Sequence, residues 1–79
     1  MEDNNKLLTF GQKAVGLTFN PSGDDAVTKI KQSYADIIDQ LNEVRESEGR
    51  SEKARLASAA ITEAQGAQMW AVKALTWKD

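Results

Sequence analysis

The stretch "SGDDAVTKIKQSYADIIDQLNEVRE", residues 22–46, carries the pattern that decides the fold. Its apolar residues recur at steps of three and four, the spacing of a helix face that packs against one partner helix. That face consists of Val27, Ile30, Tyr34, Ile37, Leu41 and Val44, and Ile38 widens it beyond a strict two-position seam. The opposite face is polar, and we expect it to be solvated; it carries Lys29, Gln32, Asp36, Asp39, Glu43 and Glu46. Ser22, Asp24 and Asp25 supply oxygens that suit a helix start, so we predict a helix over residues 22–46.

A second helical pattern follows a break around Gly49, in "SEKARLASAAITEAQGAQMWAVKALTW", residues 51–77. Ser51 is a suitable N-cap, and Glu52 suits the first turn. Small residues dominate the face that matches the first helix, and they let two helix axes approach closely. That face consists of Ala54, Ala57, Ile61, Ala64, Gln68, Ala71 and Leu75. Because the turn, residues 47–51, is short, the sequence predicts an all-α fold, an antiparallel two-helix hairpin.

Residues 1–21 form an arm and a link within one predicted domain that spans residues 1–79. The stretch "NNKLLTFGQKAV" predicts a short helix from about Asn5 to Ala14, and Gly16 ends it. The following stretch "LTFNPSG" is expected to be an extended link, because a residue that precedes proline is driven away from the αR conformation.

The second helix carries more apolar residues than one partner helix can cover. The surplus consists of Leu56, Ala60, Ala67, Met69, Trp70, Val72, Ala74 and Trp77. A helix that is apolar nearly all round is typically a buried helix. The arm can cover part of this surface through Leu7, Leu8, Phe10, Leu17 and Phe19. We therefore expect the remainder to pack against other subunits in a homo-oligomer.

Charge and composition exclude several classes of site. The chain has 79 residues, a net charge of −2, no cysteine and no histidine. Disulfides, thiolate metal sites and the commonest general base are therefore excluded, and we predict no catalytic residue, no metal and no cofactor. The near-neutral charge argues against binding to long nucleic acids but leaves open a small anionic ligand held by a few cations. No apolar run is long enough to span a membrane and the N-terminus is polar, so we expect no membrane contact and a cytoplasmic protein.

The link contains the first candidate for ligand binding. Phe19 lies there between Thr18 and Asn20, whose side chains can form hydrogen bonds. An aromatic ring beside polar groups on a loop suits stacking on a nucleobase. The alternative is that Phe19 only anchors the arm to the hairpin.

The second helix contains another candidate, formed by Arg55, Ser58 and Thr62 at steps of three and four. A guanidinium and two hydroxyls on one stripe can hold a phosphate or a carboxylate. The alternative is a solvated helix edge. Lys31, near the start of the first long helix, is a further candidate cation, and its alternative is likewise a solvated charged face.

Two stretches, "LTFNPSGDDAVTKIK" and "ARLASAAITEAQGAQMWAVKALTW", resemble a family of small phage and prophage proteins that share the anti-CBASS and Thoeris anti-defence hairpin domain. The likeness covers about Gly16 to Trp77, and "AQMWAVKA" is its most specific part. Members of this family are sponges that sequester the cyclic oligonucleotides, and in some cases the cyclic ADP-ribose-type molecules, with which bacterial immune systems signal. The resemblance implies a ring-like homohexamer with ligand sites between subunits, in the cytoplasm of a bacterial host cell.

The resemblance also implies roles for individual residues. Phe19 stands at the position of the aromatic residue that stacks on a ligand base, and Asn20 stands at the polar position before the proline. Lys31 matches a basic residue that contacts ligand. Arg55 and Thr62 match an arginine and a threonine of the second helix, counted back from "MW".

Two other functions compete with the sponge, and the preferred cyclic nucleotide stays open. A small coiled-coil assembly or adaptor protein would bind another protein through the surplus apolar surface. A nuclease would destroy the signal, but the histidine pair or clustered metal carboxylates that it needs are missing from the sequence.

Overall fold

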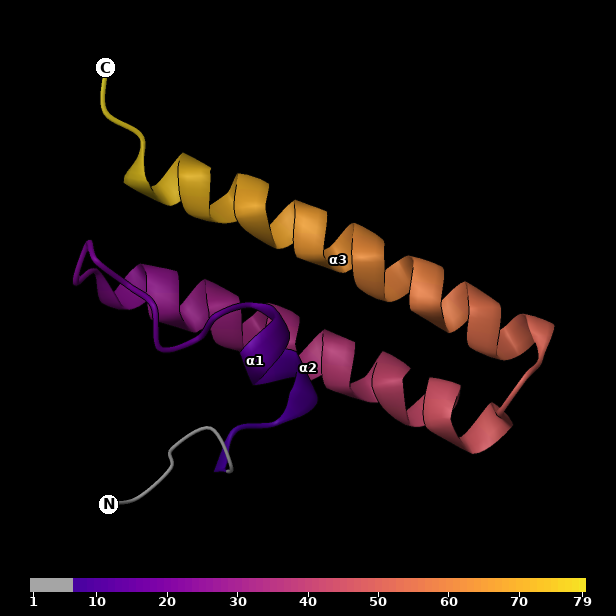
Figure 1. The fold of residues 1–79 in the computed structure, drawn as a ribbon. Coiled ribbons are helices and arrows are strands. Elements are labelled where there is room, and N and C mark those ends of the chain that lie inside the picture. The colour runs from indigo at the N-terminus through magenta and orange to yellow at the C-terminus, as the bar shows by residue number, and fades with distance from the viewer. Residues whose placement is uncertain (1–6) are drawn as a thin grey trace.

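The computed structural model describes residues 7–79, and every regular element in that range is helical. The helices are α1 (Phe10–Ala14), α2 (Asp25–Glu48) and α3 (Glu52–Thr76). Figure 1 shows α2 and α3 side by side in opposite directions, joined at one end by a short turn, with α1 lying across α2. The described part of the chain is therefore the all-α antiparallel hairpin that the sequence predicts.

The caps explain where α2 begins and ends. Its start lies three residues later than predicted because Ser22 Oγ accepts a hydrogen bond from the main-chain nitrogen of Asp24 (3.1 Å), within a turn before the helix. The Asp24 carboxylate becomes the N-cap and accepts from the nitrogen of Ala26 (2.9 Å). The helix continues past the predicted residue 46 to Glu48, where Gly49 ends it with a φ of +62°.

The arm helix is shorter than predicted. Thr9 caps α1 by accepting from the nitrogen of Gln12 (3.0 Å), and the Gln12 side chain accepts from the nitrogen of Thr9 (2.9 Å). This reciprocal capping box starts the helix at Phe10 rather than at Asn5. The first part of the predicted helix, residues 5 and 6, lies outside the described residues.

The buried face of α2 is rotated away from the predicted one. Ile37, a predicted member, has 46 % of its surface exposed, whereas Ala35 and Ile38 are fully buried. The reason is that α2 contacts two partners: α3 on one side and the arm on another. Val15 from the arm packs with Ala35, Ile38 and Ile61 in the core. Which α2 residues are buried is therefore set by the arm as well as by α3.

The arm packs against α2 through a close approach of the Gly11 main chain to the Ala35 carbonyl. A Cβ atom on Gly11 would lie 2.1 Å from the carbonyl oxygen of Ala35, so only glycine fits there. The Gly11 nitrogen donates to Asp39 Oδ1 (2.6 Å), and Gln12 Nε2 donates to Gln32 Oε1 (3.0 Å). The prediction of a solvated polar face is therefore wrong for Asp39 and Gln32, because the arm packs over them.

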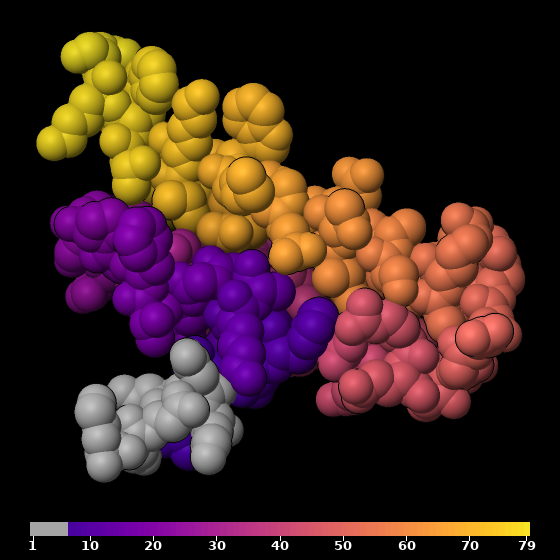
Figure 2. Space-filling view, viewed as in Figure 1, coloured from indigo at the N-terminus to yellow at the C-terminus, as the bar shows by residue number. Residues whose placement is uncertain are grey.

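The molecule is thin, and much of α3 stays uncovered. The Cα atoms extend over 44 × 38 × 12 Å, so the molecule is much thinner in one direction than in the other two. Side chains of α3 stand out along one edge in Figure 2, with no other part of the chain over them. Trp70 is 72 % exposed, and Met69, Leu75 and Trp77 are also exposed. The arm therefore leaves most of the surplus apolar surface to solvent in the single subunit.

We predict that Gly11→Ala detaches the arm or forces α2 to shift, because the new methyl group has no space beside the Ala35 carbonyl. Overpacking of this kind costs about 1–3 kcal/mol of unfolding free energy. Gly66→Ala is the matched control, since its Cβ meets nothing within 4 Å in the subunit and alanine favours a helix. Thermal unfolding by circular dichroism measures both; an unchanged melting temperature for Gly11→Ala would contradict the close approach.

Candidate functional site

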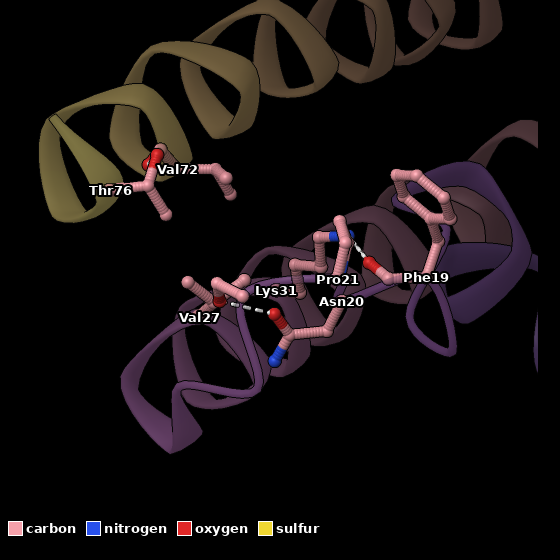
Figure 3. Close-up of a pocket in the computed structure, with 8 residues that line it drawn as sticks. Phe19, Asn20, Pro21, Val27, Lys31, Val72 and Thr76 are labelled. Atoms are coloured by element: carbon pink, nitrogen blue, oxygen red, sulfur yellow. Dashed lines mark hydrogen bonds between the residues drawn. The ribbon is translucent and has the colours of Figure 1, made fainter.

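A pocket of about 230 Å³ lies where the link, the start of α2 and the end of α3 meet. In Figure 3, Val72 and Thr76 project from α3 toward the residues of the link and α2. The lining residues are Phe19, Asn20, Pro21, Ser22, Val27, Lys31, Val72 and Thr76. Most of the lining is hydrocarbon, so the pocket suits a flat apolar group better than a charged one.

Phe19 forms the exposed rim of this pocket, with 70 % of its surface accessible. The turn before it is closed by a hydrogen bond from the Phe19 nitrogen to the Gly16 carbonyl (2.9 Å), and Gly16 adopts a φ of +62°. Glycine reaches this left-handed conformation without steric cost. The ring is thereby presented to solvent on an ordered turn, which is the arrangement that base stacking needs.

Lys31 lies behind the turn and is only 5 % exposed. Its Nζ donates to the carbonyl oxygen of Gly16 (3.0 Å) and to that of Phe19, as the dashed line in Figure 3 marks. The same Nζ lies 5.6 Å from the centroid of the Phe19 ring, within the range of a cation–π contact. The structure thus brings together Phe19 and Lys31, which the sequence indicates as two separate candidates.

Asn20 is engaged within the turn that precedes α2. Its Nδ2 donates to the carbonyl oxygen of Asp24 (2.9 Å) and to Thr28 Oγ1 (3.1 Å). Its Oδ1 accepts from Ser22 Oγ (2.6 Å). The amide therefore shapes the rim on which Pro21 sits, and its hydrogen-bonding groups already have partners in the subunit.

Thr18, the remaining link residue among the candidates, does not line this pocket. It is exposed and borders a separate surface depression formed with Leu8, Gln12, Lys13, Gly16 and Leu17. Thr18 and the pocket residues therefore line different depressions of the subunit.

The second candidate cluster lies on α3, far from the pocket. Arg55 and Val72 are 17 residues apart on one helix, which corresponds to about 25 Å along its axis. Arg55 is exposed, and its Nε and Nη2 donate to the two carboxylate oxygens of Glu52 at 2.9 and 2.5 Å. These hydrogen bonds lower the pKa of Glu52 and raise that of Arg55. Thr62 Oγ1 donates to the carbonyl of Ser58 (3.3 Å), and along this helix edge Arg55 and Thr62 are exposed whereas Ser58 is half-buried.

Sequence reasoning missed the contribution of α3 to the pocket. Val72 and Thr76 line it, and Thr76 Oγ1 donates to the Val72 carbonyl (2.9 Å). The sequence could have indicated this contribution, because an antiparallel hairpin places the end of its second helix beside the start of its first. Val27 was assigned to the hairpin contact alone, yet it also forms the floor between the two helices.

Among residues 7–79, no three histidine, cysteine, aspartate or glutamate side chains are grouped so that they could hold a metal ion. Within the same part of the chain, no helix combines the length and the apolar composition that crossing a membrane requires.

Comparison with known proteins identifies the hairpin. Residues 12–76 match the family model described as the Acb2/Tad1 hairpin domain, which covers the link, α2 and all of α3. No curated protein and no solved structure matches the chain significantly. The family match confirms the resemblance found in the sequence. The chain belongs to the Acb2/Tad1 hairpin-domain family, whose members are phage anti-defence sponges that bind cyclic nucleotide signals.

Proposed function

We propose that this protein sequesters cyclic oligonucleotide immune signals of the CBASS type without cleaving them, and that Thoeris-type cyclic ADP-ribose molecules are a second ligand class. The observation that carries the proposal is the family match over residues 12–76. The exposed Phe19 ring beside an apolar pocket supports it, because that arrangement provides stacking without any catalytic group. Sequestration requires tight binding and no turnover.

The pocket is the proposed site for a nucleobase of a cyclic dinucleotide. Of the predicted link and α2 residues, Phe19, Asn20 and Lys31 line this pocket, and Phe19 supplies the stacking face; Thr18 borders the separate depression. One subunit offers the base a wall formed by Pro21, Val27 and Val72, but few free polar groups. The phosphates of the ligand therefore need groups from a neighbouring subunit, which is the reason for placing this site at a subunit boundary.

The α3 edge is the proposed site for a second, phosphate-rich ligand such as a cyclic trinucleotide. Its residues are Arg55, Ser58 and Thr62. The guanidinium is exposed and holds the Glu52 carboxylate in a bidentate pair, which supports the proposal because the same geometry suits a phosphate. A phosphate would displace Glu52, so this carboxylate competes with the ligand.

Assembly into a homo-oligomer, a hexamer by family likeness, is part of the proposal. The thin subunit exposes Met69 and Trp70 on α3 and Trp77 directly after it. Burying large aromatic side chains of this kind is strongly favourable. The same exposed surface is the observation that favours the alternative, a small coiled-coil adaptor that binds another protein.

We predict that Phe19→Ala weakens binding of cyclic dinucleotides by about five- to a hundredfold, because one base loses a stacking contact worth about 1–3 kcal/mol. Phe19→Tyr keeps the ring and should bind like the parent. Leu7→Ala, another exposed arm residue, is the matched control. Calorimetry measures the affinities, and chromatography of the ligand released by denaturation should recover it intact. A parent protein that binds no cyclic nucleotide would favour the adaptor, and a cleaved ligand would identify an enzyme.

For the α3 edge we predict opposite effects from two neighbouring substitutions. Arg55→Ala should weaken binding of a cyclic trinucleotide by more than about tenfold, because a charge-assisted contact is lost. Glu52→Gln should leave the affinity equal or higher, since it removes the competing carboxylate. Titration calorimetry on both variants gives the comparison. Equal affinity for the parent and Arg55→Ala would show that the phosphate site lies elsewhere.

Trp70→Ala is predicted to shift the assembly toward smaller species while the helical content per subunit is preserved, because 72 % of Trp70 is exposed in the single subunit. Glu63→Ala, an exposed polar position on the same helix, is the control. Analytical ultracentrifugation at micromolar concentration measures the assembly. A parent protein that sediments as a monomer would contradict both the oligomer and the shared ligand sites.

A further inference from the structure

We propose that Lys31 is a positioning residue, which holds the Phe19 ring at the rim of the pocket by binding the main chain of the link. This inference rests on the proposed function of the pocket and gives Lys31 a role other than ligand contact. The observation behind it is that a lysine on a helix is 5 % exposed and directs its ammonium at two carbonyl groups of another segment.

Burial of a lysine is unfavourable unless its charge is compensated. Neither ion pair in residues 7–79 involves Lys31, so carbonyl oxygens rather than a carboxylate take up its hydrogen bonds. The two acceptors are Gly16 and Phe19, the first and last residues of the link turn. A buried cation whose partners are both in one turn contributes most directly to the conformation of that turn.

The link turn is held by hydrogen bonds from two donors, the Phe19 nitrogen and Lys31 Nζ. The Gly16 carbonyl accepts from the Phe19 nitrogen (2.9 Å) as well as from Lys31 Nζ (3.0 Å). The carbonyl of Phe19 accepts from the same Nζ, and the ring of Phe19 lies 5.6 Å from it. Lys31 therefore restrains both the main chain and the side chain of the residue that is proposed to stack.

The same geometry limits direct contact with a ligand. An ammonium has three hydrogens, and two of them point to carbonyl oxygens of the link. A ligand that approaches the rim meets the exposed Phe19 ring first, with the nearly buried Lys31 behind it. The effect of Lys31 on affinity then comes from ordering the ring before binding, because preordered groups reduce the entropy that binding must remove.

The first test needs no ligand. Lys31→Met keeps an unbranched apolar stem and removes the ammonium, and Lys29→Met is the matched control at an exposed lysine of the same helix. Amide hydrogen exchange should become faster at Gly16, Leu17 and Phe19 in Lys31→Met only, while the core of α2 and α3 keeps its protection. Unchanged exchange in the link would overturn the proposal, and so would faster exchange throughout the hairpin, which marks a general loss of stability.

The second test is a double-mutant cycle in cyclic dinucleotide binding, with Lys31→Met and Phe19→Ala alone and combined. If Lys31 acts through the ring, Lys31→Met weakens binding by about three- to tenfold in the parent and has little further effect in Phe19→Ala. Equal losses in both backgrounds would overturn the proposal in favour of direct contact. A parent that binds no cyclic nucleotide would refute the proposed function, whereas the exchange experiment would still decide whether Lys31 holds the link.

Discussion

The close approach of the arm to α2 is the contact on which the rest of the structure depends. Gly11 lies against the Ala35 carbonyl, where no side chain fits, and its nitrogen is bound by Asp39. This contact brings Val15 into the core and sets where the link crosses α2. Because the link crosses there, Lys31 reaches its carbonyl groups and the pocket forms against the end of α3. A glycine in a short helix thus determines the position of an aromatic ring eight residues later.

The small residues of α3 have two consequences for the subunit. Ala54 and Ala57 let the hairpin close tightly, and they leave little hydrocarbon with which to build a thick core. The large side chains of α3, including Trp70 and Trp77, lie instead on its exposed surface. In the proposed assembly this surface becomes the interface, so subunit stability and ligand binding are both linked to association.

The two candidate sites suit different groups of a cyclic nucleotide, one the base and the other the phosphate. The pocket beside Phe19 is apolar and its polar groups are engaged, which suits a base. The exposed edge at Arg55 carries a guanidinium already paired with a carboxylate, which suits a phosphate. In the proposed function both sites act through stacking and charge-assisted hydrogen bonds, which need no general base. Their separation by about 25 Å along α3 explains how one small chain can address two ligand shapes in the proposed function.

The sequence by itself determined the two long helices, their antiparallel pairing, the cap at Ser51, and the family, because helix period, capping and short turns are local patterns. It also indicated Phe19 and Lys31 as separate candidates for ligand binding. Only the tertiary structure decided the rotated core of α2, the role of Asp39, the burial of Lys31 and the contribution of Val72 to the pocket. The apolar periodicity of a helix predicts the face that packs against one partner, whereas α2 packs against both α3 and the arm. The docking of the arm could not be predicted, because it depends on contacts between residues far apart in the chain.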